Sequence, residues 1–493
     1  MRVLSLLALL VSAPALAQPM LVADVDEGAD DGQVSELYVF DGTIYFSGKA
    51  FGGVELWRYF PSTDIAEGVT NLRAQSLKPN GMVELDGLLY FNGNNDANGR
   101  ELWRFDPATD EAEVVADIAP GPDPGDPTDL VVFDGDLYFQ ALTVENLKEL
   151  WRYDPETGVT EQTPEIRDDG SAGPIDLVPL GDFLYFRAFE DGIGDELWRY
   201  DPVMDTSTVV VNLVRGEPSS EPRHILAYDG ALYFFAKSAG DSPWDQLWTY
   251  DPATDTATKL ADIPVGEGED WRPDELYLLG DDLYFFAGSA DGADDLWRHR
   301  PATGVTEFVA ELAPGTGDDD RRPLPLADLD GVLFFAANAD ASGRELWQYD
   351  SASGIVSRVT DIHPAGSSDP VDAVVFEGEI YFGATDGVNG QELWKYTPPP
   401  VAGEEGPEAS GVGQIVPNPA TEVARLVVSL DAPGEVRLVV IDALGREVAR
   451  ATQALSAGQH EMAVPLEALA LGAYSIRIEA PGGIATRRMT VVR

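Results

Sequence analysis

Oxygen-donating side chains gather in polar, glycine-rich segments of this sequence, between stretches of apolar residues. The segment NNDANGRE (94–101) is typical, with three asparagines and an aspartate close together. Hard cations such as Ca²⁺ take several carboxylate and carbonyl oxygens at once. The candidate calcium ligands are Asn94, Asp96, Asp291, Asp340 and Asp386. No segment has the spacing of the EF-hand loop. We therefore favour the alternative, in which these residues belong to an acidic surface that keeps the protein hydrated.

Two tryptophans in such polar segments are candidates for stacking on a ligand. Trp244 in DSPWDQ and Trp271 in GEDWRPD lie outside the repeated motif described below. An exposed indole ring offers a large flat contact area, but a tryptophan in a long loop can equally hold that loop in place. Trp244 and Trp271 are the candidate ligand-binding residues, and their structural role is left open as the alternative.

Residue types that commonly carry catalysis are scarce. The chain has no cysteine, which excludes disulfides and thiolate metal sites. Its four histidines stand at unrelated positions, and no phosphate-binding loop, nucleophile elbow or metal-ligating helix motif is present. Acidic residues are too numerous to single out the carboxylate pair of a glycosidase. We assign no catalytic and no cofactor-binding residue, keep Ca²⁺ as the one candidate cofactor, and favour a protein that is not an enzyme.

A Leu-Trp pair recurs eight times and indicates which elements position these residues. Its tryptophans stand at 57, 103, 151, 198, 248, 297, 347 and 394, at spacings of 46 to 50 residues. About ten residues before each pair lies an aromatic signature such as IYF, LYF or LFF. A period of this length indicates a repeat architecture. Each unit holds four β-prone segments separated by Gly, Asp and Pro turns, which is typical of a β-propeller blade.

The two ends of the repeat region predict how the ring closes. The last unit stops at QELWKYTPPP after its third strand, and MLVADVDEG (20–28) resembles the fourth-strand segments of other units. The N-terminal segment can supply the missing outer strand, which leaves no open sheet edge. The predicted fold class is all-β. It is an eight-bladed β-propeller of four-stranded blades whose N-terminal strand closes the last blade, followed by a small Ig-like β-sandwich.

Blade topology also predicts which face binds. In a four-stranded antiparallel blade, the connections between strands 2 and 3 and between strand 4 and the next blade emerge on one face. They are the longer and more variable connections, so we expect ligand contacts there. The glutamate that precedes most Leu-Trp pairs is expected to hydrogen-bond backbone or arginine between blades, because a buried carboxylate must be paired. Gln246 and Asp295 replace that glutamate in two units.

Charge and composition divide the chain into parts. The first residues combine an arginine, an apolar run and a small-x-small cleavage site, as in a secretory signal peptide, and no later segment is apolar enough to span a bilayer. A net charge of −54 makes nucleic acid a poor partner. The tail is neutral, with eight arginines and eight acidic residues. The expected parts are a signal peptide (1–17), the propeller (18–397), a Pro/Gly/Glu linker (398–412) and a C-terminal sandwich (413–493).

Both main parts resemble known families. The units resemble the ELWxxDGT repeats of secreted bacterial proteins over about residues 20–396, although Asp-Pro-Ala-Thr replaces Asp-Gly-Thr at the turn. This resemblance implies little about activity. The tail resembles the type IX secretion C-terminal sorting domain through VPNPATEVARLVVSL (416–430), VRLVVIDALGREV (436–448) and LEALALGAYSIRI (466–478). That resemblance implies export across the outer membrane by the type IX machinery, followed by release or attachment at the cell surface.

These observations favour a secreted or cell-surface propeller that serves as a binding, adhesion or structural module. Its expected ligand is a carbohydrate or another surface protein. The alternative is an extracellular hydrolase or lyase that acts on polysaccharide with carboxylates of the longer connections. A catalytic site needs asymmetry among those connections, so the close similarity of the units favours the binding or structural role.

Overall fold

The structure is a computed structural model. It describes residues 18–26, 31–50, 52–69, 76–167, 170–214, 219–237, 245–261, 263, 273–288, 294–312, 323–338, 343–398, 412–416, 424–430, 433–441, 447–464, 466, 469, 472–480 and 483–491. These residues form β-strands, turns and extended connections, with no helix among them. Within the same residues, nothing is helical, long and apolar enough to cross a membrane. One compact unit is Gln18–Thr397, and a second contains Pro398–Arg493.

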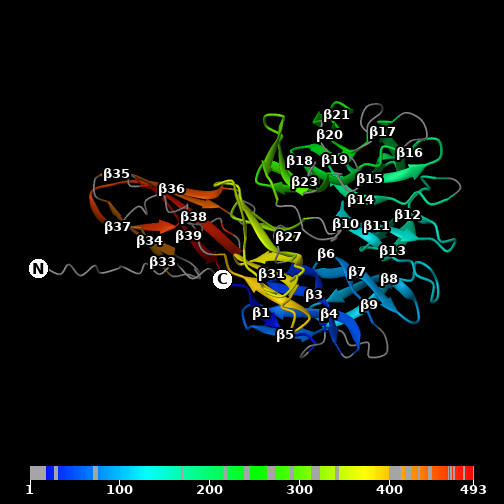
Figure 1. Cartoon of the computed structure of the whole chain (residues 1–493), viewed down its shortest axis with the longest axis horizontal. Coiled ribbons are helices and arrows are strands. Elements are labelled where there is room, and N and C mark those ends of the chain that lie inside the picture. The colour runs from blue at the N-terminus through cyan, green and yellow to red at the C-terminus, as the bar shows by residue number, and fades with distance from the viewer. Residues whose placement is uncertain are drawn as a thin grey trace, which may run out of the picture. The chain divides into compact units, whose positions relative to one another are not determined.

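Eight antiparallel sheets of four strands build the unit Gln18–Thr397 and follow one another around a ring in chain order (Figure 1). The first strands of the blades are β2 (Ser35–Phe40), β6 (Asn80–Leu85), β10 (Thr128–Phe133), β14 (Ile175–Leu180), β18 (Arg223–Tyr228), β22 (Asp274–Leu279), β26 (Leu324–Leu329) and β30 (Val371–Phe376). Each first strand lies against the first strands of both neighbouring blades, including β2 against β30. The first strands therefore form a closed inner wall.

The other strands follow outward in chain order within each blade. The second strands are β3 (Thr43–Ala50), β7 (Leu88–Asn95), β11 (Asp136–Leu142), β15 (Phe183–Glu190), β19 (Ala231–Ala236), β23 (Asp282–Gly288), β27 (Val332–Ala337) and β31 (Glu379–Thr385). The third strands are β4 (Gly53–Phe60), β8 (Gly99–Asp106), β12 (Lys148–Asp154), β16 (Gly194–Asp201), β20 (Gln246–Asp251), β24 (Asp294–Arg300), β28 (Glu345–Asp350) and β32 (Gln391–Tyr396). The fourth strands are β5 (Ile65–Gly68), β9 (Glu111–Ala116), β13 (Val159–Gln162), β17 (Thr206–Val211), β21 (Thr256–Ala261), β25 (Val305–Ala310), β29 (Ile355–Arg358) and β1 (Met20–Ala23).

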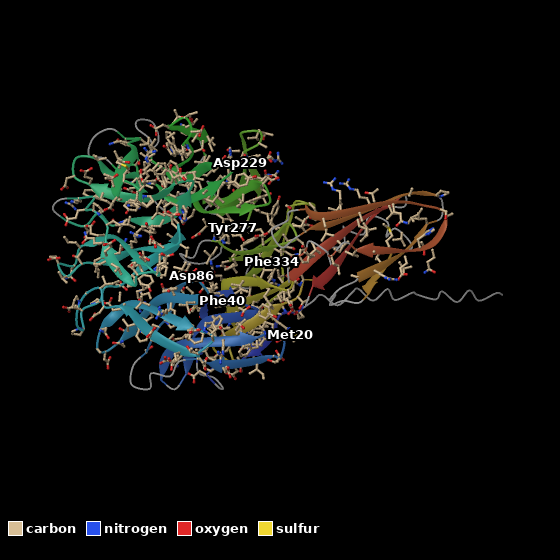
Figure 2. The ribbon with its side chains drawn as sticks, turned by 180° about the vertical axis from the view of Figure 1, so that it is seen from behind. Met20, Phe40, Asp86, Asp229, Tyr277 and Phe334 are labelled. Carbon is tan, nitrogen blue, oxygen red and sulfur yellow. The ribbon has the colours of Figure 1, made fainter. Side chains whose placement is uncertain are left out.

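The N-terminal strand closes the ring, as the sequence predicts. β1 pairs antiparallel with β32, so that Leu21 faces Trp394 and Met20 faces Lys395. Figure 2 shows Met20 beside the strands of the last blade. The outermost strand of blade 8 therefore comes from the start of the chain, and its antiparallel pairing with β32 shifts register once, between Leu21 and Ala23. The predicted eight-bladed, four-stranded propeller is thereby confirmed.

Aromatic pairs join the blades at every interface. Each pair links the second strand of one blade to the third strand of the next, with ring centroids 5.5 to 6.1 Å apart. The pairs are Tyr45–Phe105, Tyr90–Tyr153, Tyr138–Tyr200, Tyr185–Tyr250, Tyr233–His299, Tyr284–Tyr349, Phe334–Tyr396 and Tyr381–Tyr59. The leucine of every Leu-Trp pair is at most 1% exposed. The repeated letters therefore encode the packing of blade on blade.

The second unit is built from two sheets. One holds β33 (Val412–Val416), β34 (Ala424–Leu430) and β37 (Gly458–Val464). The other holds β36 (Glu447–Leu455), β35 (Gly434–Ile441), β38 (Gly472–Ala480) and β39 (Gly483–Val491). Buried residues of both sheets share one core, as in a β-sandwich. The expected signal peptide (1–17) and most of the expected linker (399–411) lie outside the described residues.

Candidate functional site

A β-bulge near the start of every first strand gives the inner wall one irregular position per blade. The pairing of first and second strands shifts register there in all eight blades. In seven of them the second residue of the first strand has a left-handed backbone. These residues are Glu36, Gly81, Asp129, Asp176, His224, Glu275 and Asp372, with φ between 49° and 65°. A proline cannot adopt that conformation, and Pro325 takes the equivalent place in blade 7.

We call the five carboxylates at this position the acidic ring: Glu36, Asp129, Asp176, Glu275 and Asp372. Such side chains reach across to the next blade. Asp372 accepts a hydrogen bond from the backbone NH of Glu36 at 3.0 Å, and Glu36 accepts one from Gly81 at 3.0 Å. Asp176 accepts one from the backbone NH of His224, also at 3.0 Å. The ring therefore joins neighbouring blades and concentrates negative charge at the inner wall.

The acidic ring is enclosed by protein but keeps contact with water. Asp129 and Asp372 are exposed, whereas Glu36 and Glu275 are half-buried. Burial raises the pKa of Glu36, Asp129 and Glu275 above the ordinary value, and neighbouring carboxylates add to the effect. The carboxylate that raises the pKa is Asp372 for Glu36 and Asp176 for Asp129. A cation that enters the ring would relieve this mutual repulsion.

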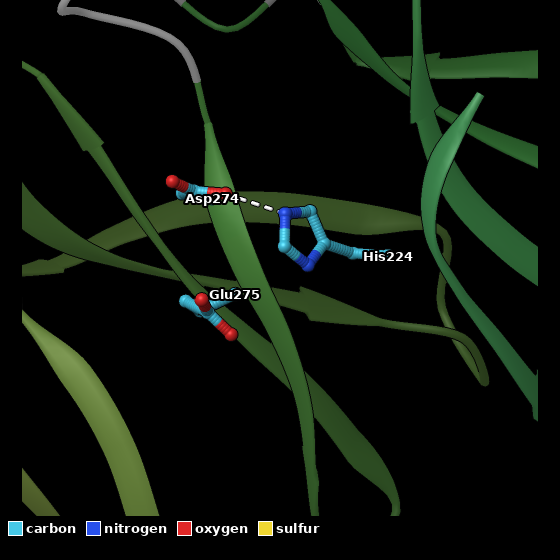
Figure 3. A group of neighbouring side chains, drawn as sticks. All are labelled: His224, Asp274 and Glu275. Carbon is cyan, nitrogen blue, oxygen red and sulfur yellow. Dashed lines mark ion pairs between the residues drawn. The ribbon is translucent and has the colours of Figure 1, made fainter. Parts of the chain in front are cut away.

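Blades 5 and 6 hold a cluster of different chemistry. His224 lies on β18, while Asp274 and Glu275 begin β22 (Figure 3). The Nε2 atom of His224 lies 2.5 Å from an Oδ atom of Asp274. One ligand atom from each of the three residues lies within 4.8 Å of the others, and no other group of the described residues has geometry suited to a metal ion. Burial lowers the pKa of His224, but Asp274 and then Glu275 and Asp176 outweigh it, so the pKa is raised overall.

Contacts around this cluster fix its backbone. The backbone NH of His224 donates a hydrogen bond to the carboxylate of Asp176. Arg223 donates from Nη2 to the carbonyl oxygen of Pro273 at 3.2 Å, immediately before Asp274. Arg223 also pairs with the buried carboxylate of Asp245. The two strands that carry the cluster are thus tied to each other and to blade 4.

The glutamates that precede the Leu-Trp pairs have a structural role. Glu101 accepts backbone hydrogen bonds from Ile118 and Gly125, each at 2.8 Å. Both donors belong to the connection that leads to the next blade, so one buried carboxylate holds the two ends of that connection. Glu392 holds Val25 and Gly32 in the same way, across the ring closure. Burial raises the pKa of these side chains, despite the hydrogen bonds, to about 7. The affected residues are Glu101, Glu149, Glu196, Glu345 and Glu392.

The candidate calcium ligands of the sequence fall in different blades and have local roles where the structure describes them. Asn94 is the penultimate residue of β7 and donates from Nδ2 to the carbonyl oxygen of Ser76 at 3.2 Å, and Asp96 lies in the turn after the strand. Asp386 accepts hydrogen bonds from the backbone of Val388 and Asn389 within its own loop. These bonds outweigh burial and lower the pKa of Asp386. Asn94 and Asp96 belong to blade 2 and Asp386 to blade 8, and their role as calcium ligands stays a prediction.

Four predicted residues lie outside the described residues: Asp291, Asp340, Trp244 and Trp271. Their role stays a prediction. The acidic ring and the His224 cluster were missed by sequence reasoning, although a signal was present. In seven of the eight units a proline stands two residues before the ring position, and six of the eight ring positions hold Asp, Glu or His.

A family model identifies the end of the chain. Residues 414–492 match the secretion system C-terminal sorting domain. The chain is therefore a propeller that carries a sorting domain for type IX secretion, and export takes it to the cell surface or the extracellular space. No curated protein matches the chain.

Solved structures resemble the chain only distantly. One is an oligogalacturonate lyase in complex with manganese, at 15% identity and a TM-score of 0.41 over 78% of this chain and 93% of that one. A prolyl endopeptidase has 12% identity and a TM-score of 0.47, over 84% of this chain and 57% of that one. PorZ, a surface component of the type IX secretion system of Porphyromonas gingivalis, has 13% identity and a TM-score of 0.31, over 94% and 76%. At these values the likenesses carry no argument about activity or ligand.

Proposed function

We propose that this exported propeller is an extracellular binding module that holds a positively charged group of a ligand at the acidic ring. The observation that carries the proposal is the convergence of five carboxylates at one repeat position on the closed inner wall. These side chains keep water access at Asp129 and Asp372, and an incoming cation can reach them. The likeness of the units to ELWxxDGT repeats stays a prediction and adds nothing to the choice of ligand.

The chemistry of the ring favours a basic segment of another surface protein as the ligand. Arginine pairs with carboxylates through two parallel hydrogen bonds, and its guanidinium group is more weakly hydrated than an ammonium group. A neutral carbohydrate would gain nothing from the charge that the ring concentrates. Burial, and then a neighbouring carboxylate, raise the pKa of Glu36 and Asp129, and a guanidinium group would favour their charged forms.

The test measures binding of a short oligo-arginine peptide to the mature chain by calorimetry. A ring variant combines Glu36→Gln, Asp129→Asn and Asp372→Asn. We expect it to bind the peptide at least about tenfold more weakly, because each lost charge pair is worth about 0.5–1 kcal/mol. Asparagine and glutamine keep a carbonyl oxygen for the hydrogen bonds to the next blade, and asparagine tolerates the left-handed backbone.

A matched control removes the same charge from the opposite face. It combines Asp41→Asn, Asp134→Asn and Asp229→Asn, which are exposed residues of turns between first and second strands and also have a left-handed backbone. We expect the control to bind within about twofold of the unmodified chain, because these charges are screened from the ring by solvent and salt. Equal weakening in both variants would show that binding follows total charge, and the proposal would be wrong.

The alternative function is an extracellular polysaccharide hydrolase or lyase that uses carboxylates of the same face. It predicts turnover of a glycan, which a binding module does not show. Polysaccharide cleavage by the unmodified chain that disappears in the ring variant and persists in the control would replace the binding proposal with this alternative.

A further inference from the structure

We propose that His224, Asp274 and Glu275 form a binding site for a divalent transition metal ion at the seam between blades 5 and 6. The inference goes beyond the binding of a basic ligand and does not depend on it. Figure 3 shows the imidazole of His224 and the two carboxylates facing a common space from two adjacent first strands.

The donor set points to the class of metal. One imidazole nitrogen together with carboxylate oxygens suits Zn²⁺ and Mn²⁺, whereas Ca²⁺ and Mg²⁺ prefer oxygen ligands alone. Ligand atoms at about 2.1 Å from a metal lie about 3 Å from one another. The Nε2 atom of His224 lies 2.5 Å from an Oδ atom of Asp274, and one ligand atom from each residue lies within 4.8 Å of the others, which is close to the separations within a metal site. The side chains of His224 and Asp274 are 29% and 23% exposed, which leaves positions for water or a ligand group.

The supporting contacts are those of a preorganised site. Asp176 holds the backbone of His224, and Arg223 holds the carbonyl oxygen of Pro273 next to Asp274. Metal sites depend on such outer contacts, because they keep the ligands in place before the ion arrives. The arginine is itself neutralised by Asp245, so its charge is not free to repel a cation.

The repeat gives an independent reason to place function at this seam. At the ring position, Glu36 and Asp372 use their carboxylates to bind the next blade. His224 stands where that acceptor belongs, and its imidazole instead meets Asp274. The contact still joins the two blades, but it uses an imidazole, a side chain that binds metal ions well.

Further departures from the repeat occur in the same two blades. Gln246 and Asp295 replace the repeated glutamate, and His299 replaces the aromatic residue of the third strand. Trp244 and Trp271 lie in the sequence segments that flank the third and fourth strands of blade 5.

The test titrates Zn²⁺ into the mature chain by calorimetry, after chelator treatment and dialysis. Salt of about 0.5 M and millimolar Ca²⁺ suppress diffuse binding to a strongly acidic protein. We expect one Zn²⁺ per chain, with at least about tenfold weaker binding in His224→Ala and in Asp274→Asn. Asp229→Asn, an exposed carboxylate of the same blade, is the control and should change the affinity less than about twofold.

A second measurement keeps the proposal open to refutation if a variant fails to fold. In the unmodified chain loaded with Co²⁺, a bound imidazole should give a paramagnetically shifted, exchangeable NMR signal. Absence of that signal, absence of saturable Zn²⁺ binding, or unchanged affinity in a folded His224→Ala variant would each overturn the site. Zn²⁺ binding is measured without peptide, and peptide binding can be measured with chelator present, so either proposal can fail alone.

Discussion

Glu101 offers a sharp test of how the blades are connected. It is fully buried, and burial raises its pKa from 4.5 to about 7 against the opposing effect of the hydrogen bonds from Ile118 and Gly125. The folded chain therefore binds a proton at this group that the unfolded chain has already lost between pH 4.5 and about 7. The contribution to stability is complete below pH 4.5 and is lost as the pH rises through about 7.

We expect Glu101→Gln to remove this pH dependence. Glutamine is an uncharged analogue of the protonated side chain, and the same position naturally holds Gln246 in blade 5, where its Oε1 accepts the NH of Ile263 at 2.8 Å. Between pH 5.5 and pH 8 the variant should gain about 2 kcal/mol of unfolding free energy relative to the unmodified chain. For a unit of this size, that corresponds to a relative rise of about 2–3 °C in melting temperature.

Tryptophan fluorescence during thermal unfolding is the appropriate assay. All ten tryptophans lie between residues 57 and 394, so the signal reports the propeller and not the sorting domain. Glu111→Gln, an exposed change of the same type on β9, is the control and should show no such relative gain. If Glu101→Gln instead loses stability relative to the unmodified chain as the pH rises, the hydrogen bonds outweigh burial and the reasoning is refuted.

Two further predictions concern ring closure and packing. Met20→Cys combined with Lys395→Cys should form a disulfide under oxidising conditions, because the two residues face each other across β1 and β32. The control pair, Met20→Cys with Glu161→Cys, should form none. Mass spectrometry after digestion detects the cross-link, and a disulfide in the control pair would contradict the predicted ring closure. Tyr138→Leu should destabilise the propeller by about 2–3 kcal/mol, because it empties part of a buried interface with blade 4. Val203→Ala, at an 86% exposed residue, should change stability by less than about 0.5 kcal/mol, and an equal effect in both would show that the aromatic pair is unimportant.

The propeller ring and its closure were predictable because the number of strand segments in each unit can be counted in the sequence. Every unit repeats the same apolar segments, the last unit lacks its fourth strand, and the N-terminal segment resembles one. An unpaired outer strand edge is unfavourable. The sequence therefore predicts that the N-terminal segment pairs with the third strand of the last blade. The pairing of Leu21 with Trp394 is the outcome.

The acidic ring was not predictable by the same reasoning, because its position breaks the alternation on which strand prediction rests. Side chains of a regular strand point to alternate faces. The left-handed backbone at Asp129 and the bulge that follows it interrupt that alternation. In the sequence, Asp129 is one aspartate among many in an acid-rich connection. Only its position two residues after Pro127 distinguishes it from the others.

Comparison between blades separates the structural from the functional use of a repeated position. A residue that every blade needs for packing, such as the leucine of the Leu-Trp pair, is buried in all eight. Position two of the first strand is different, because the fold accepts glycine, proline, histidine or an acid there and still closes. The fold therefore tolerates several residue types at this position. The joint presence of the five carboxylates on the inner wall is the basis of the binding role that we propose, alongside the bonds that Glu36, Asp176 and Asp372 make to the next blade.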